Sequence, residues 1–447
     1  MDKSKLPPGP KGKVPLSHLF SFRRDSLRFL KNIAAEYGDV VHFKMGPLRL
    51  VLINHPDFIK EVLSVQHSNF VKGRPLEMAK KLLGEGLLTN EGEFHKRQSR
   101  IIQPAFHSKM MNAYAPAMTE YSVRLMNGWK DGMKVDMMDE MVRMSTGIAG
   151  KTMFNMDIAE EAPEINDALK SIMTLFGRIT LPFAELLLNL PLPGTIRFFK
   201  AKARLDDVIN RIINERRRSR LKNGDLLSLL LEAQEETGGD SGITDQQIRD
   251  EALTLFLTAF DTTSLALTWT WYLLSQHPAV EAELHEELDK VLGGRMPTME
   301  DFPQLKFTRM VFTEAMRMYP PIYIIARQAI ASFSIGNYTV SAGTIVLMSP
   351  YLIHHDARFH PEPEQFNPSL WAERASLQNS RYDYLPFSGG PRSCIGQQYA
   401  WLEGILVLAS IAQFWRLKLV PGHRVELQQL INLRPKYGMM MEVQRRK

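Results

Sequence analysis

The single cysteine of the chain, Cys394, has neighbours that suit a metal-bound thiolate. It lies in the glycine-rich segment Phe-Ser-Gly-Gly-Pro-Arg-Ser-Cys-Ile-Gly, residues 387–396, at the start of a helix expected over residues 395–414. Unpaired amide groups and the positive end of a helix favour a thiolate, which is the form that binds metals. Gly390 and Gly396 allow the backbone to turn tightly and to approach a flat cofactor. The loop therefore predicts a metal ligand.

Two other side chains of the loop extend this hypothesis. Arg392 carries a fork of donors that suits a carboxylate of such a cofactor, and Phe387 can keep water away from the sulfur. Two alternatives stay open. Cys394 can be a small buried hydrophobe, as free cysteines most often are, or a hydrolytic nucleophile. A nucleophile needs a histidine partner, for which three upstream residues are candidates: His354, His355 and His360.

The spacing of the loop resembles the haem-binding signature of the cytochrome P450 family. Phe387, Gly390, Arg392, Cys394 and Gly396 match all of its fixed positions. Five fixed positions over ten residues seldom coincide by chance, and the resemblance extends from Pro7 to the C-terminus. It implies haem b (iron protoporphyrin IX) as the cofactor, with Cys394 as the axial ligand that donates electron density to the iron and O₂ as the co-substrate.

A long apolar segment, Ala252 to Ser275, has Asp261 as its only charge. Its length would suit a membrane span, but a central carboxylate is costly in lipid, so a buried core helix is favoured. The resemblance places the oxygen-activation stretch here. It implies Thr262 as the alcohol that hydrogen-bonds to the oxygen being activated and Asp261 as the acid that relays protons. Ala259 stands where the family most often has glycine.

Glu314 and Arg317 are one helical turn apart and can pair. The resemblance implies a buried ion pair that braces the cysteine loop and specifies its geometry. The family commonly completes this pair with an arginine at the position of Leu370. We expect either that the pair stands alone or that another base, such as His355 or Arg374, takes that place.

Residues 92–106 resemble the helix of the family that binds a haem propionate. His95 replaces the usual tryptophan and can still donate to a carboxylate. Ser99 replaces the arginine expected four residues later, which leaves one propionate contact in doubt. The resemblance also implies a propionate contact from Arg327, which follows the Glu314 helix.

The charge balance excludes some partners. The chain has 55 Lys and Arg against 49 Asp and Glu, a net charge of +6 that is too weak to indicate nucleic acid binding. A basic cluster is formed by Lys96, Arg97 and Arg100. It can dock an acidic electron donor, or it can simply be a helix face exposed to solvent. One cysteine excludes an intramolecular disulfide, and no apolar leader opens the sequence. We expect a cytoplasmic monomer without a membrane anchor.

The elements that position these residues follow from the pattern. Apolar residues recur at helical spacing from Pro56 to about Leu231. Thr244 and Gln247 have the spacing of a capping box that starts the long apolar helix. A polar loop is expected over residues 235–242, before this helix. Further helices are expected over residues 29–37, 307–318 and 395–414, and strands over 40–44, 49–53, 333–338 and 340–348, with turns at Gly336-Asn337 and Ala342-Gly343.

The segment from His354 to Pro391 is long, Pro-rich and irregular, which is typical of a functional loop. Neither a repeat nor a linker divides the chain, so we expect one domain over residues 1–447, beginning with a Pro-rich segment at residues 1–12. The predicted fold is mostly α with a small β portion and is cytochrome P450-like.

The implied function is a haem-thiolate monooxygenase. It would insert one oxygen atom from O₂ into a small apolar substrate, such as a fatty acid, terpenoid or steroid-like molecule, by hydroxylation or epoxidation. The sequence has no nucleotide-binding glycine motif, so electrons from NAD(P)H would come through a ferredoxin, flavodoxin or reductase. The resemblance implies a pocket lined by residues 76–88, Leu255, Ala259, 321–325 and 431–433, which are nearly all apolar.

Other functions stay open. A peroxygenase or isomerase on the same fold is one alternative, although neither needs the proton relay that Asp261 and Thr262 suggest. A Cys-dependent hydrolase and a haem carrier or gas sensor without turnover are the others.

Overall fold

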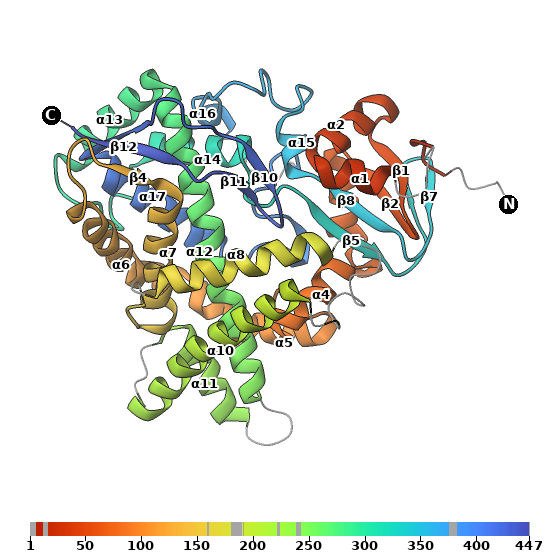
Figure 1. Cartoon of the computed structure of the whole chain (residues 1–447), viewed down its shortest axis with the longest axis horizontal. Coiled ribbons are helices and arrows are strands. Elements are labelled where there is room, and N and C mark those ends of the chain that lie inside the picture. The colour runs from red at the N-terminus through yellow and green to blue at the C-terminus, as the bar shows by residue number, and fades with distance from the viewer. Residues whose placement is uncertain are drawn as a thin grey trace.

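The 32-residue helix α12 (Asp245–Gln276) runs through the core of the computed structural model (Figure 1). Its capping box forms as predicted: the Gln247 amide donates to Thr244 Oγ1 (3.2 Å), and the Thr244 amide donates to Gln247 Oε1 (3.0 Å). The apolar run is buried and packs against α7 (Met137–Phe154), α14 (Lys306–Met318) and α10 (Pro193–Ser219). The prediction of a core helix is therefore confirmed.

The structure describes residues 6–11, 17–158, 161–179, 190, 192–220, 224–237, 243–374 and 382–446. Within these ranges, a search for a helix with the length and apolar character of a bilayer span gives none. The other helices are α1 (Ser17–Arg24), α2 (Ser26–Tyr37), α3 (Pro56–Lys60), α4 (Arg74–Leu83), α5 (Gly92–Ile102), α6 (Ser108–Asn127), α8 (Ala162–Ile179), α11 (Leu226–Thr237), α13 (Pro278–Leu292), α15 (Pro350–His354), α16 (Leu370–Arg374) and α17 (Gln397–Ala412).

The largest sheet lies at one side of the molecule, next to α1 and α2 (Figure 1). Its strand order is β1-β2-β8-β5-β3, and β2 and β8 are parallel. Its strands are β1 (Val40–Met45), β2 (Leu48–Ile53), β3 (Phe70–Val71), β5 (Ile325–Ala329) and β8 (Ile345–Met348). The predicted N-terminal hairpin is confirmed, with Val40 opposite Ile53.

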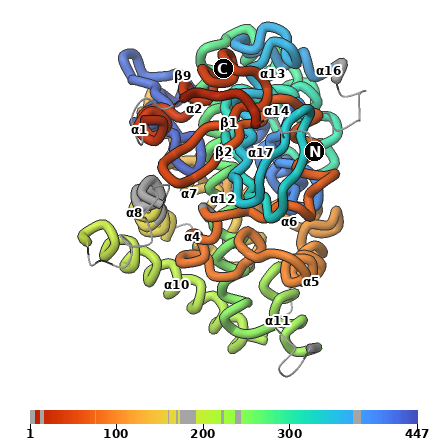
Figure 2. The backbone as a smooth tube through the Cα atoms, turned by 90° about the vertical axis from the view of Figure 1, so that its right-hand side faces the viewer, coloured from red at the N-terminus to blue at the C-terminus, as the bar shows by residue number. Residues whose placement is uncertain are grey.

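Three small sheets complete the β portion. They consist of β4 (Lys134–Asp136), β12 (Met440–Arg445) and β9 (Trp415–Leu419); β10 (Leu427–Gln429) and β11 (Leu433–Pro435); and β6 (Phe333–Ile335) and β7 (Tyr338–Val340). Helices α4 and α5 lie between the large sheet and α10 and α11 in both views (Figures 1 and 2). The fold is mostly α with a small β portion, as predicted.

The two turns predicted within residues 333–348 are confirmed, although the strands are shorter than predicted. Gly336 (φ +52°) reverses the chain at the expected Gly336-Asn337 turn and lets β6 pair with β7. The chain turns again at Ala342-Gly343, so Val340 ends β7 and only β8 joins the large sheet. The segment 354–391 is irregular except for α16 and one short 3₁₀ turn, Gly390–Arg392, where it is described. The predicted polar loop at 235–242 is helical up to Thr237, and residues 238–242 lie outside the described ranges.

Candidate functional site

The backbone holds the cysteine loop in one tight conformation. The Cys394 amide donates to the Phe387 carbonyl (3.0 Å), which closes the loop. Gly390 has φ +69°, and a Cβ there would collide with the Leu63 carbonyl. Only glycine fits a position with both constraints. Gly396 is the N-cap of α17, so the sulfur lies just before a helix, as predicted.

The Cys394 thiol lies deep in the molecule but is not covered. Its side chain is exposed, yet burial among protein atoms raises the pKa of the thiol above its usual value. A backbone hydrogen bond from Gly396 lowers that pKa by a smaller amount. Together, exposure and depth mean that the sulfur faces a recess inside the molecule. The amide therefore acts in the predicted direction, but desolvation has the larger effect on this pKa.

Basic groups converge beside this loop. Arg392 is paired with Glu91 through Nη2, whereas its buried Nη1 has no hydrogen-bond partner in the described residues. Arg327, on β5, is half-buried, and desolvation together with the charge of Arg392 lowers its pKa to about 10. Burial lowers the pKa of His95 to about 3, and the charges of Arg392 and Lys72 contribute to the shift. The structure thus brings together the three predicted propionate ligands, Arg392, Arg327 and His95.

Lys72 belongs to the same cluster and was not predicted. It follows β3, and its buried ammonium donates to the carbonyls of Leu87 (3.0 Å) and Leu88. Its amide donates to Glu91 Oε1 (2.7 Å). Burial and the charge of Arg392 lower its pKa to about 7. The only sequence signal is a lysine between an apolar strand and Gly73, because no motif spacing marks the position.

One stripe of α12 faces an open space. Thr258, Ala259 and Thr262 are partly exposed, although most of the surrounding helix is buried. Their spacing of one and four residues places them on one side of the helix. Thr262 Oγ1 donates to the Thr258 carbonyl (2.9 Å), and the helix continues without a break.

Asp261 is held elsewhere. Its carboxylate is buried, forms an ion pair with Arg434 on β11, and accepts a hydrogen bond from Asn432. The predicted acid and the predicted alcohol are therefore adjacent in sequence, but the acid is engaged by the C-terminal hairpin. The sequence pattern gave no sign of this partner.

Glu314 and Arg317 form the expected buried ion pair, with Nε to Oε2 and Nη2 to Oε1 both at 2.8 Å. The third member is Trp371, whose indole Nε1 donates to Glu314 Oε2 (2.8 Å). His355 does not fill this place, since its Nδ1 contacts the Tyr351 carbonyl (2.8 Å). The side chain of Arg374 lies outside the described residues. The remaining donors of Arg317 bind the carbonyls of His354, Pro363 and Gln365.

This ion pair is connected to the cysteine loop through backbone contacts. His354 Nδ1 contacts the Arg317 carbonyl (3.1 Å), and the Leu385 amide donates to His354 Nε2 (2.8 Å). His360 Nε2 contacts the Asp383 carbonyl (2.8 Å). Two of the three histidines considered as bases for Cys394, His354 and His360, therefore hold the backbone that leads into the loop, whereas His355 contacts Tyr351. Among the described residues, no group of His, Cys, Asp and Glu could hold a metal ion.

The segments expected to line a pocket lie against α12. The Leu87 amide donates to Glu251 Oε2 (2.8 Å), and the Leu433 carbonyl accepts from Trp269 Nε1 (3.0 Å). The Leu433 amide donates to the Pro321 carbonyl (2.9 Å), which connects residues 431–433 to residues 321–325. Thus residues 87 and 433 contact the helix that carries Thr262.

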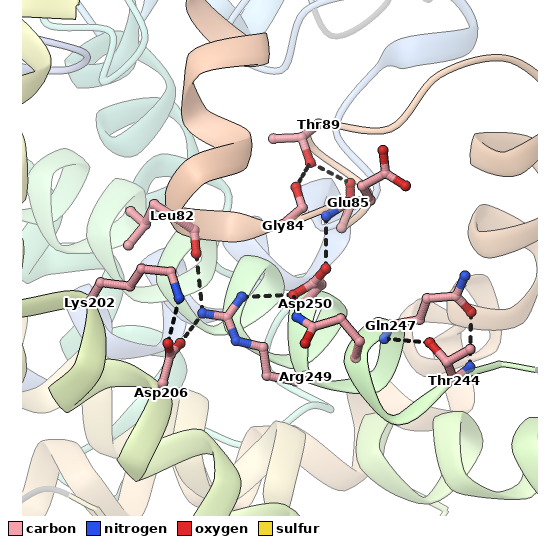
Figure 3. A network of polar contacts seen from close by, with 12 residues as sticks. Leu82, Gly84, Glu85, Thr89, Lys202, Asp206, Thr244, Gln247, Arg249 and Asp250 are labelled. Atoms are coloured by element: carbon pink, nitrogen blue, oxygen red, sulfur yellow. Dashed lines mark hydrogen bonds and ion pairs between the residues drawn. The ribbon is translucent and has the colours of Figure 1, made fainter. Parts of the chain in front are cut away.

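A network of polar contacts ties α4, α10 and α12 together (Figure 3). Arg249 donates to Asp250 (2.7 Å) and to the Leu82 carbonyl (3.2 Å), and is paired with Asp206 of α10. The Glu85 amide donates to Asp250 Oδ2 (2.9 Å). These contacts fix the turn after α4 against α12.

The residues present fit a haem. A haem has one axial coordination position for a sulfur and two propionates that need cationic partners. The uncovered Cys394 sulfur and the unpartnered Nη1 of Arg392 meet these needs from one loop. Phe387 packs against Trp401 beside the loop, with ring centroids 5.7 Å apart.

Comparisons with known proteins agree with this geometry. A family model described as cytochrome P450 matches residues 7–441. The chain is 37% identical to cyclooctat-9-en-7-ol 5-monooxygenase of Streptomyces melanosporofaciens, over 92% of this chain and 89% of that protein. It is 37% identical to cyclooctatin synthase of the same organism, over 93% and 90%. It is 31% identical to pentalenene oxygenase of Streptomyces avermitilis, over 92% and 91%.

Proposed function

This chain belongs to the cytochrome P450 family of monooxygenases, and we propose that it inserts one oxygen atom from O₂ into a terpenoid substrate. The observation that carries the proposal is that the Cys394 sulfur is accessible although it lies deep inside the molecule. The loop that holds this sulfur turns at position 390 in a way that only glycine allows. Haem bound through this sulfur would supply the activation of O₂.

The residues of the chain have separate roles in this proposal. Arg392, Arg327 and His95 would hold the propionates, since they converge beside the loop and Arg392 Nη1 is free to donate. Thr262 Oγ1 would hydrogen-bond to the reacting oxygen, because it lies on the partly exposed stripe of α12. Asp261 would relay protons after its carboxylate exchanges Arg434 for another partner.

The choice of a terpenoid among apolar substrates rests on two observations. The relatives are named for cyclooctat-9-en-7-ol, cyclooctatin and pentalenene, and the first and last are by name an unsaturated alcohol and an alkene. Apolar residues at positions expected to line the pocket are buried on α12 or in segments that contact it: Leu255 on the helix itself, and Leu87 and Leu433 beside it. An apolar lining selects a substrate by shape and offers little to a charged group.

Cofactor and partners follow the same proposal. Haem b is the form held without covalent attachment, which suits a chain whose single cysteine is the iron ligand. Electrons from NAD(P)H would come through a ferredoxin, flavodoxin or reductase. Lys96, Arg97 and Arg100 are exposed on α5 and offer such an acidic partner a basic surface. We propose that the protein acts as a cytoplasmic monomer.

Two measurements test the proposal in sequence. The reduced, carbon-monoxide-treated protein should show the Soret band of a thiolate-ligated haem, and the Cys394→Ala variant should not. Incubation of the protein with a surrogate ferredoxin, its reductase, NADPH and pentalenene should then give an oxygenated product. A colourless protein after haem supplementation would overturn the assignment. Turnover with peroxide alone would indicate a peroxygenase, and haem binding without turnover would indicate a carrier or sensor.

A further inference from the structure

Positive charge exceeds negative charge beside the cysteine loop. The charges of Arg392 and Arg327 both lower the pKa of Lys72, and the charge of Arg392 lowers that of Arg327, so the three cations lie close together. Glu91 balances one of them, since its two oxygens accept from the Lys72 amide and from Arg392. Glu251 also lies near Lys72, but burial raises its pKa to about 8, so it is mostly neutral at pH 7. Buried cations in such excess require an anionic partner.

Two of these cations have donors left over. Arg392 Nη1 is buried without a hydrogen-bond partner in the described part of the chain. The Lys72 ammonium has three donors. The two that the structure accounts for bind the carbonyls of Leu87 and Leu88, at the edge of the segment that contacts α12. One donor of Lys72 can therefore reach a further acceptor without breaking either contact.

Helix α5 contributes no positive charge to this cluster. Ser99 stands one turn after His95, at the position where the resemblance led us to expect an arginine. His95 itself is neutral at pH 7, because burial and the neighbouring cations lower its pKa to about 3. The exposed Lys96, Arg97 and Arg100 are on the solvent side of the helix. The site thus lacks one cation on α5 and has one extra cation after β3.

We propose that Lys72 supplies the charge that α5 lacks, by donating from its ammonium to a haem propionate. This inference rests on the proposed haem enzyme. Lys72 and Arg392 share Glu91 as a neighbour, so a carboxylate that accepts from Arg392 Nη1 comes within reach of both cations. A propionate there would also raise the pKa of Lys72 from about 7 and keep the ammonium charged.

A purely structural role for Lys72 makes different predictions. In that case the ammonium would only hold the Leu87 and Leu88 carbonyls in place. An arginine at position 99 could then not compensate for the loss of Lys72. The decisive variants are therefore Lys72→Met, Ser99→Arg and the double variant. Lys80→Met is a matched control, because Lys80 is paired with Glu77 (3.2 Å) on α4.

Haem loss from each oxidised holoprotein is measured by transfer to excess apomyoglobin, followed by absorbance. Lys72→Met should lose haem roughly ten- to a hundredfold faster than the wild type, the effect of losing one hydrogen bond to a charged group. Adding Ser99→Arg should restore slow loss, and Lys80→Met should leave the rate unchanged. With haem dimethyl ester, which has no carboxylates, Lys72→Met and the wild type should lose haem at the same rate.

Three results would overturn the inference: an unchanged rate for Lys72→Met, a failure of Ser99→Arg to restore it, or a difference that persists with the ester. Urea unfolding of the apoproteins checks that each variant folds. Failure of the proposed function is a separate result, since the wild type itself would then show no thiolate-ligated haem.

Discussion

The Asp261 carboxylate on α12 and the Arg434 guanidinium on β11 form a buried ion pair. Asn432 donates to the same carboxylate, and Arg434 Nε donates to Asn432 Oδ1 (3.0 Å). The contact joins the helix that carries Thr262 to the C-terminal hairpin. Any proton relay through Asp261 therefore depends on Arg434, which is 173 positions away in the sequence.

Replacing Arg434 with Met should destabilise the protein by about 3–5 kcal/mol, because it leaves the Asp261 carboxylate buried without a counter-charge. Asp261→Asn combined with Arg434→Met should cost less than Arg434→Met alone. The free energy of unfolding in urea measures both. Arg124→Met is the control, since its pair with Asp157 is half exposed and worth about 1 kcal/mol or less. A double variant that is as unstable as Arg434→Met, or less stable, would contradict the prediction.

Thr262→Ala should uncouple reductant consumption from product formation. The variant removes the hydroxyl on the partly exposed stripe of α12, and a positioned proton donor contributes about a hundredfold or more to such steps. Product formed per NADPH oxidised is the measurement. Thr263→Ala is the matched control, because Thr263 is buried and donates to the Ala259 carbonyl (3.1 Å). Unchanged coupling in Thr262→Ala would contradict the role.

Trp371→Phe should lower the free energy of unfolding by about 1.5–3 kcal/mol, the cost of losing a hydrogen bond to a charged group. The indole Nε1 is the donor that completes the buried Glu314 and Arg317 pair. In a Glu314→Gln background the same substitution should cost about 1 kcal/mol, since the acceptor is then neutral. Additive losses in the double variant would mean that the indole and the carboxylate do not interact.

Stability should fall as the pH rises from about 5 to about 8 through Glu403. Burial raises the pKa of this carboxyl from 4.5 to about 8, and the Ser145 hydroxyl offsets only part of the shift. In that range the folded protein holds a proton that the unfolded chain releases, so each pH unit costs up to about 1.4 kcal/mol. Glu403→Gln removes this contribution. The difference in unfolding free energy between variant and wild type should thus grow in favour of the variant as the pH rises, and a constant difference would refute the prediction.

Local patterns in the sequence were sufficient for most of the fold. The helical spacing, the capping box at Thr244 and the hairpin of β1 and β2 depend on residues a few positions apart, so the sequence predicts them directly. The turn between β6 and β7 was likewise predicted from Gly336 and Asn337, whereas the ends of these strands depend on which residues pair across the turn.

By itself, the sequence determined the chemistry that the protein carries. Covalent order fixes three features: the spacing of the Cys394 loop, the helical turn between Glu314 and Arg317, and the adjacency of Asp261 and Thr262. Each feature places reactive or charged side chains at set positions along the chain. Through their resemblance to the cytochrome P450 family, these features were enough to indicate a thiolate-ligated haem and its class of reaction.

Only the tertiary structure decided the partners of those groups. Trp371 completes the Glu314 pair, Arg434 engages Asp261, and Lys72 joins Arg392, although 57, 173 and 320 positions, respectively, separate these pairs along the chain. Burial also raises the pKa of the Cys394 thiol, an effect that the loop sequence does not indicate. The physical reason is shared: hydrogen bonding and desolvation depend on which atoms are close in space, and long-range packing sets that proximity.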